Sequence, residues 1–366
     1  MSNISDMHTV DPKLDEYLDR VFRMAKSYQT KRTYKVCLNK FFKFLGTKNK
    51  QISDLLLECK QKKVDPIMVL DEFYTYMSKQ NMRNRSIASY LCVVKDFLNF
   101  HELHIYSEDV KQRFRTPKTE VFYEEGLTKQ ILNRILHNSV PKLQAAILVA
   151  CSSGIRVGEL VQLRISDIDF TTSPTTLKIR RDTTKTRETR FTHITNEASK
   201  ILSDYITKNL KNQLSSDPYI FMKYQGEEDT FSYYKAVIST RGSLMNMLRR
   251  AVLAVPELAT KNEGGGYQIH FHAFRKWFKT QVTNAQESDF AEALMGHKSL
   301  KLVYYKQNAQ DRQRMYKKLE PHLTISDFTN FEKTMEEMQS QLESLTLELE
   351  KVKQWKEITA KYQKKA

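Results

Sequence analysis

Several side chains in the middle and later parts of the chain have types and an order that suit chemistry on a phosphodiester: Arg156, Lys185, His272, Arg275, His297, Tyr304 and Tyr305. Arginine forks fit the non-bridging oxygens of a phosphate, and histidines move protons or donate hydrogen bonds near neutral pH. A lysine on a turn can protonate a leaving oxygen, and a deprotonated tyrosine is a covalent nucleophile. Together these residues predict metal-free transesterification through a phosphotyrosine.

These side chains lie in short motifs, each of which is weak by itself. The motifs are residues 154–160 (Gly-Ile-Arg-Val-Gly-Glu-Leu), 272–275 (His-Ala-Phe-Arg), 294–300 (Leu-Met-Gly-His-Lys-Ser-Leu) and 304–306 (Tyr-Tyr-Lys). Their order, with a lysine between the first two, resembles that of the tyrosine recombinase (lambda-type integrase) family. The residues within the motifs resemble those of its archaeal cellular or viral members. The resemblance covers residues from about 28 to 323.

The resemblance implies a phosphate-binding set. Arg156 and Arg275 bind the scissile phosphate and stabilise its developing charge, and His297 donates a hydrogen bond to a phosphate oxygen. Glu159 matches an accessory acid that orients the first motif. Lys276 stands where many members have a second histidine, so we expect no such role at that position.

The resemblance also implies the groups that move protons and attack. Lys185 protonates the departing 5′ oxygen, although Lys178 on the preceding strand is an alternative. His272 accepts the proton of the nucleophile or supports the phosphate. Tyr305 attacks to give a 3′-phosphotyrosine. It lies one residue closer to the glycine–histidine pair than is usual in the family, and Tyr304 is closer still, so Tyr304 remains the competing nucleophile.

We expect no metal and no other cofactor. A zinc site at His270, His272 and His297 would need a carboxylate or water nearby, and we do not expect one. The chain contains neither a phosphate-cradling GxxxxGK[ST] loop nor a dinucleotide fingerprint.

The composition favours a polyanionic partner. Lys plus Arg number 59 against 43 Asp plus Glu, so the net charge is +16, which attracts phosphate and gains from counterion release. Four cysteines without a CxxC pair exclude a disulfide scaffold and suit a reducing cytosol. The sequence shows neither a membrane span of ~18 apolar residues nor a signal peptide. We therefore expect a cytoplasmic, nucleoid-associated protein that binds double-stranded DNA.

Basic residues in three segments are candidate DNA contacts: Lys31, Arg32, Lys35, Lys111, Arg113, Arg115, Lys118, Arg180, Arg181 and Arg187. Arg190 belongs to the same basic hairpin as the last three, and all four are expected to position phosphates without reading sequence. For the first segment, an ordinary helical bundle with solvated lysines fits equally well.

The hydrophobic period predicts a mainly α protein with a small β-hairpin or sheet (α+β). Helices are expected after Thr30, over 55–60 and 67–77 with Asp65 as N-cap, and from Ser86. A buried helix is expected over 143–150, after a helix that Thr128 caps. The expected organisation is a polar arm (1–27), a helical core-binding domain (28–110), a basic linker (111–125), a catalytic domain (126–323) and a C-terminal coiled-coil helix with a basic tail (324–366).

Two strands, 177–181 and 189–194, are expected to form a hairpin with a cationic turn around Lys185. Next, helices are expected over 197–210 and 241–254. The residues around His270 and His272 are expected to be extended.

The last segment has an apolar seam that alternates by four and three residues: Phe331, Met335, Met338, Leu342, Leu345, Leu349 and Val352. Such a seam is typical of a coiled coil, and a single long helix on the body is the alternative. The resemblance implies a homotetramer on two DNA sites that exchanges strands through a Holliday junction, for integration or excision of a virus or mobile element. The competing functions are a degenerate member that binds DNA without cutting and a topoisomerase-like relaxer.

Overall fold

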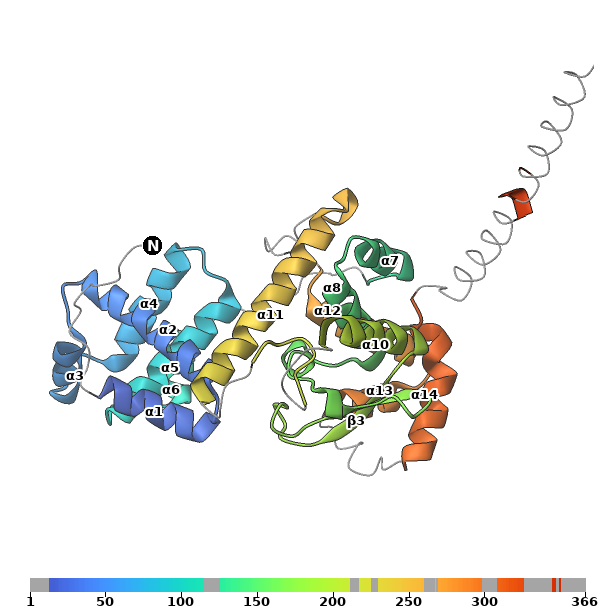
Figure 1. Cartoon of the computed structure of the whole chain (residues 1–366). Coiled ribbons are helices and arrows are strands. Elements are labelled where there is room, and N and C mark those ends of the chain that lie inside the picture. The colour runs from blue at the N-terminus through green and yellow to red at the C-terminus, as the bar shows by residue number, and fades with distance from the viewer. Residues whose placement is uncertain are drawn as a thin grey trace, which may run out of the picture. The chain divides into compact units, whose positions relative to one another are not determined.

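The computed structural model describes residues 13–114, 126–210, 217–224, 230–259, 267, 269–297, 308–325, 344–346 and 349 (Figure 1). The chain divides into two compact units, Met1–Tyr123 and Glu124–Ala366. Helices dominate both units and a small antiparallel sheet lies in the second, so the expected mainly α fold with a small sheet is confirmed. Within the described ranges, none of the helices is both long and apolar enough to cross a bilayer.

The first unit is a bundle of helices around an aromatic core. Phe41 and Phe73 meet edge to face with ring centroids 5.2 Å apart, and Tyr17 meets Phe97 at 5.1 Å. All four rings are fully buried, so each removes a large apolar area from water and stabilises this unit. The helices are α1 (Leu14–Ala25), α2 (Tyr28–Gly46), α3 (Ile52–Lys60), α4 (Pro66–Lys79), α5 (Asn84–Phe100) and α6 (Ser107–Arg113).

Helix α1 corrects the expected polar arm. Leu14, Tyr17, Leu18 and Val21 recur at i, i+3, i+4 and i+7, and all four are buried in the core of the first unit. The charged residues between them obscure this stripe, but they lie on its solvated side. Most of the described part of the expected arm is therefore a helix that belongs to the core of the first unit. Residues 1–12 lie outside the described residues.

Helix boundaries follow the capping residues only in part. The side chains of Asp65 and Thr128 accept hydrogen bonds from the N–H groups of Ile67 (2.9 Å) and Ile131 (3.2 Å), which confirms both expected N-caps. Ser86 is not a cap, because α5 already begins at Asn84. Helix α6 occupies the start of the expected linker, and residues 115–125 lie outside the described residues.

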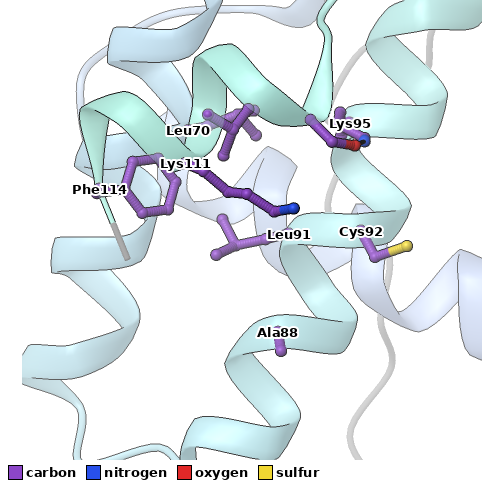
Figure 2. Close-up of a pocket in the computed structure, with 9 residues that line it drawn as sticks. Leu70, Ala88, Leu91, Cys92, Lys95, Lys111 and Phe114 are labelled. Carbon is purple, nitrogen blue, oxygen red and sulfur yellow. Dashed lines mark hydrogen bonds between the residues drawn. The ribbon is translucent and has the colours of Figure 1, made fainter. Parts of the chain in front are cut away.

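A cavity of about 630 Å³ lies in the first unit between α4, α5 and α6 (Figure 2). Leu70, Leu91 and Phe114 give it an apolar lining, and Lys95 and Lys111 lie at the same cavity. The Lys95 ammonium donates to the Ser107 hydroxyl at 2.6 Å, which fixes the start of α6 against α5. None of the predicted catalytic residues lines this cavity.

The second unit is built around one buried helix, as the apolar run predicted. Helix α8 packs against α10, α12 and β3, and its residues from Ala145 to Ser153 are all buried. The elements are α7 (Lys129–His137), α8 (Pro141–Ser153), α9 (Val157–Leu160), 3-10 helices Ile165–Asp167 and Pro256–Leu258, β1 (Ile168–Asp169), β2 (Thr175–Ile179), β3 (Arg190–Ile194), α10 (Asn196–Leu210), α11 (Thr230–Leu253), α12 (Phe271–Asn284), α13 (Ser288–Met295) and α14 (Ala309–Leu323).

The sheet has the order β1-β2-β3 and is antiparallel throughout. The expected hairpin is present as β2 and β3, which pair Leu177 with Thr192 and Lys178 with Phe191. Leu177 and Thr192 are buried, whereas Lys178 and Phe191 are exposed, because successive side chains of a strand point to opposite faces. Strand β1 is an addition that the sequence pattern did not predict.

Candidate active site

The site is organised around the carboxyl end of α8, where a helix leaves its last carbonyl groups without intrahelical partners. Side chains from three other elements donate to these oxygens. The Tyr316 hydroxyl donates to Ser152 O at 2.6 Å, the Thr192 hydroxyl donates to Ser153 O at 3.1 Å, and the Arg275 guanidinium donates to Gly154 O. The end of α8 therefore joins α14, β3 and α12 at one point.

Gly154 ends α8 in the left-handed region, with φ of +62°. A Cβ at this position would lie 2.5 Å from Cδ1 of Phe278 and 3.0 Å from Cγ of Met295. Glycine is therefore required both for the backbone conformation and for the close approach of α12. This turn carries the chain directly into Arg156.

Arg275 lies on α12 and is 3% exposed. Besides Gly154 O, its guanidinium donates to Met295 O at 2.9 Å and lies 2.9 Å from Nε2 of His297. Burial, together with the nearby charge of Arg156, lowers the pKa of Arg275 to about 9, so the group remains a cation at neutral pH. The structure thus brings Arg275 and His297, two of the predicted phosphate ligands, into direct contact.

Arg156 stands at the N-cap of the short helix α9 and is held by Glu159. The carboxylate accepts from the Arg156 guanidinium and from the Arg156 backbone N–H, both at 3.0 Å. The Arg156 side chain is 32% exposed, whereas that of Glu159 is 2% exposed. Glu159 is therefore a buried carboxylate that holds a partly exposed arginine, and its orienting role in catalysis stays a prediction.

Arg190 on β3 is a residue whose position the sequence analysis misjudged. Its guanidinium donates to both oxygens of Glu159, at 3.1 and 2.5 Å, and its Nε donates to Leu294 O at 2.9 Å. The side chain is 10% exposed, so it is largely buried. Arg190 ties β3 to α9 and to the end of α13 just before Gly296 and His297. Successive side chains of a strand point to opposite faces, and Arg190 points to the buried face of β3. This alternation could have distinguished Arg190 from the exposed arginines of the hairpin.

The electrostatics of Glu159 follow from these contacts. Burial alone raises the pKa of a carboxyl group, but hydrogen bonds and charge from Arg190, with a smaller contribution from Arg156, outweigh it. The pKa of Glu159 therefore lies below its ordinary value, and the group is ionised at neutral pH. Two arginines share one buried carboxylate at this point.

His297 follows α13 after Gly296, which also has a positive φ of +67°. On the side away from Arg275, its Nδ1 contacts the carboxylate of Glu292, which also pairs with the ammonium of Lys279. The His297 side chain is 38% exposed. Burial and the charge of Arg275 lower the pKa of His297, while Glu292 acts in the opposite direction.

His272 and Lys185 belong to the same unit as this cluster. His272 stands three residues before Arg275 in α12, so the two share a side of that helix. Lys185 is exposed on the turn between β2 and β3. Tyr304 and Tyr305 lie outside the described residues, as does nearly all of the C-terminal seam.

The segment around His270 is not extended as expected. His270 is the N-cap of α12, and its Nδ1 accepts from the N–H of Ala273 at 3.2 Å. His270 and His272 therefore do not share one face of a strand. Among the described residues, no group of three or more His, Cys, Asp or Glu side chains is placed to hold a metal ion.

The candidate DNA contacts fall into different environments. Arg32 and Lys35 are exposed on α2, and Lys31 donates to Asp19 of α1 at 2.5 Å. Lys111 and Arg113 are exposed on α6; Arg115 and Lys118 lie outside the described residues. Beside Lys185, Arg181 and Arg187 are exposed.

Arg180 differs from the other hairpin cations. It forms an ion pair with buried Asp167, donates to Gln162 O at 2.9 Å, and is only 20% exposed. Its guanidinium is therefore engaged within the protein in this structure.

Comparisons with known proteins find relatives of this chain. The phage integrase family model matches residues 125–312, just over half of the chain. Tyrosine recombinase XerC of Oceanobacillus iheyensis is 26% identical over 240 residues, which are 62% of this chain and 71% of that protein. A tyrosine recombinase of Pseudothermotoga lettingae is 25% identical over 239 residues, covering 63% of this chain and 73% of that protein.

Solved structures share the fold at lower identity. The Tn1549 transposon integrase in complex with transposon right end DNA has a TM-score of 0.53 at 17% identity, covering 82% of this chain and 97% of the other. A lambda integrase dimer bound to a COC′ core site has the same TM-score and identity, covering 82% and 77%.

Proposed function

The chain belongs to the phage integrase family of tyrosine recombinases, and on this premise we propose that it binds duplex DNA and recombines it at specific sites through a 3′-phosphotyrosine intermediate. The observation that carries the proposal is the cluster at the end of α8. There Arg275 contacts His297 at 2.9 Å, and the charge of Arg156 is close enough to lower the pKa of Arg275.

The cluster suits a phosphate because it concentrates cationic hydrogen-bond donors that the protein has already positioned. Arg275 is fixed by two carbonyl oxygens, and Arg156 is fixed by Glu159, so neither arginine must be ordered when a phosphate arrives. Preorganised donors of this kind stabilise the extra charge of the pentavalent transition state more than they stabilise the ground state. In the proposed roles, Arg156 and Arg275 hold the non-bridging oxygens and His297 donates to one of them.

The proposed reaction forms one ester bond and breaks another. The hydroxyl oxygen of Tyr305 attacks the phosphorus, its proton passes to His272, and the bond from phosphorus to the 5′ oxygen breaks. Lys185 gives a proton to that oxygen as it leaves. The new phosphotyrosine ester retains the energy of the broken bond, so the 5′ hydroxyl of another strand can reverse the step without ATP. Every charge and proton is handled by side chains, so the scheme requires no metal.

The cations outside the cluster are proposed to position the duplex. Lys31, Arg32 and Lys35 belong to the first unit, and Arg181 and Arg187 flank Lys185 on the second. Contacts of this kind bind the DNA backbone without reading bases. They weaken at higher salt concentration, because the free energy gained by releasing counterions becomes smaller. The Tn1549 integrase in complex with transposon right end DNA and the lambda integrase dimer bound to a core site support a DNA partner for this chain.

We further propose that protomers assemble as a tetramer on two sites and that the C-terminal seam contributes to this assembly. Leu345 and Leu349 belong to the seam and are 59% and 57% exposed, so their apolar surface is available to another helix. Tetramer assembly would allow strand exchange through a Holliday junction. Integration or excision of a mobile element is the proposed biological setting, and a gene next to a partial copy of itself would support it.

The test is trapping of the covalent adduct on a nicked suicide substrate. After cleavage, the short fragment that carries the new 5′ hydroxyl diffuses away, so the adduct accumulates. Wild type is expected to form the adduct, Tyr305→Phe to abolish it, and Tyr304→Phe to retain it. The two variants are a matched pair, because each removes one hydroxyl from adjacent positions. Specific binding by wild type with no adduct would instead identify a binding protein that does not cut. Adduct formation in both variants would refute Tyr305 as the required nucleophile.

A further inference from the structure

The histidine that follows Gly296 has a carboxylate partner that the proposed catalytic set does not contain. Glu292 lies on α13, and its Oε2 accepts a hydrogen bond from His297, while its Oε1 accepts one from Lys279 on α12. The Glu292 side chain is 19% exposed, so the pair is partly shielded from solvent. In the roles proposed above, Glu292 makes no contact with the phosphate itself.

The contacts on the two sides of the ring define its tautomer. Arg275 lies 2.9 Å from Nε2 of His297, and a guanidinium offers only donors, so Nε2 must be the accepting nitrogen. The ring proton therefore lies on Nδ1, where it is donated to Glu292. Glu292 thereby fixes both the tautomer and the ring orientation, and Nε2 faces the guanidinium that is proposed to bind phosphate.

We propose that Glu292 is a positioning residue for recombination, which holds His297 with Nε2 toward the phosphate and stabilises the imidazolium that forms there. When a phosphate enters, one of its oxygens replaces Nε2 as the acceptor of an Arg275 hydrogen, while the guanidinium keeps its bonds to Gly154 O and Met295 O. Nε2 then takes a proton from solvent and donates it in a hydrogen bond to the phosphate. This inference rests on the proposed function.

The surroundings of the ring explain why a carboxylate is needed. Among the described residues, the charged groups near His297 include Glu292 on α13, Arg275 and Lys279 on α12, Arg156 at the start of α9, and Arg190 on β3. The buried carboxylate of Glu159 is already shared by two arginines. In the part of the chain that the structure describes, Glu292 is therefore a negative group in direct contact with the ring, and it opposes the cost of a second positive charge beside Arg275. Glu292 raises the pKa of His297, whereas burial and Arg275 lower it, so the carboxylate favours the charged ring.

The first experiment does not depend on cleavage. Histidine-labelled full-length protein is titrated by NMR, and the His297 ring is identified by the signal lost in His297→Gln. We expect the Nδ1-protonated tautomer in wild type. Glu292→Gln keeps an acceptor for Nδ1 but removes the charge, so its His297 should titrate at lower pH. Lys279→Gln is the matched control: it removes a cation and should leave the titration unchanged or move it to higher pH. A wild-type ring protonated on Nε2, or identical titrations in wild type and Glu292→Gln, would overturn the inference.

The second experiment measures formation of the covalent adduct as a function of pH. Loss of the imidazolium produces a falling limb as pH rises, and Glu292→Gln should move that limb to lower pH. At pH values above the limb, we expect Glu292→Gln to form the adduct roughly tenfold more slowly than wild type. A tenfold change in the charged population of His297 corresponds to a shift of the limb by about one pH unit. If wild type forms the adduct and the limb is unchanged in Glu292→Gln, this inference fails while the proposed function stands. If wild type forms no adduct, the proposed function fails and the role of Glu292 fails with it.

Discussion

Replacing Arg190 by methionine tests whether the buried pair with Glu159 holds the candidate active site together. Methionine keeps most of the length of the side chain but removes three hydrogen bonds, two to Glu159 and one to Leu294 O. Removing one partner of a buried ion pair costs about 3–5 kcal/mol, because a buried charge is left behind. Glu159 still accepts two hydrogen bonds from Arg156, so we expect the lower end, about 3 kcal/mol of unfolding free energy.

The assay follows from the two tryptophans of the chain, Trp277 and Trp355, which both belong to the second unit. In a Trp355→Phe background, Trp277 is the remaining reporter, and it is buried in the core of that unit. Urea unfolding followed by its fluorescence therefore measures the second unit. Far-UV circular dichroism of the same samples records both units and provides the control that the first unit is unaffected.

A double-mutant cycle gives the refuting result. Glu159→Gln in the Arg190→Met background removes the stranded charge, so the double variant should be less destabilised than the sum of the single changes, by about 2 kcal/mol. A coupling energy near zero, or a loss below about 1 kcal/mol for Arg190→Met alone, would show that the pair does not stabilise the site.

The pH dependence of this loss has a defined sign. Arg190 and Arg156 hold the pKa of Glu159 below its ordinary value against the effect of burial, so the stability it contributes is present above its unfolded pKa and is lost as pH falls through the folded pKa. Without Arg190, burial raises the pKa of Glu159. The difference between wild type and Arg190→Met should therefore be largest above the raised pKa of the variant and shrink as pH falls. It shrinks first as Glu159 of the variant takes up a proton above the ordinary value of 4.5, and further as wild type loses its contribution below 4.5.

Three other changes test separate parts of the structure. Gly154→Ala should cost about 2–4 kcal/mol of unfolding free energy in the same assay, because the new methyl group meets Phe278 and the φ is positive; Gly158→Ala, with no atom within 4 Å of its Cβ, should cost less than about 0.5 kcal/mol. Lys185→Ala should slow cleavage by ~10²-fold or more, and a 5′-thiol leaving group, which needs no proton, should restore the rate; failure of this rescue would exclude Lys185 as the acid. Deletion of residues 330–366 should preserve cleavage but weaken tetramer formation on DNA, and an unchanged mass in light scattering would contradict the assembly role.

Local patterns in the sequence were sufficient for several of the elements and for the first set of candidate residues. The apolar period identified α2 and α8, and short polar residues at the right offset identified the caps of α4 and α7, because these signals depend on neighbours within one helical turn. Helix α1 escaped the same reasoning because its apolar stripe is interrupted by charges, although Leu14, Tyr17, Leu18 and Val21 are all buried.

The sequence by itself determined which chemistry is available, since the arginines, histidines, lysine and tyrosines of the motifs are present in the family's order. Only the tertiary structure decided which of these groups meet and what holds them. Arg190 reaches Glu159 across 31 positions and Leu294 across 104, and Arg275 reaches Gly154 across 121. Such pairs arise from the packing of α8, β3, α12 and α13 against one another. No helical or strand period records them, because a period describes one element's face and not the partner that covers it.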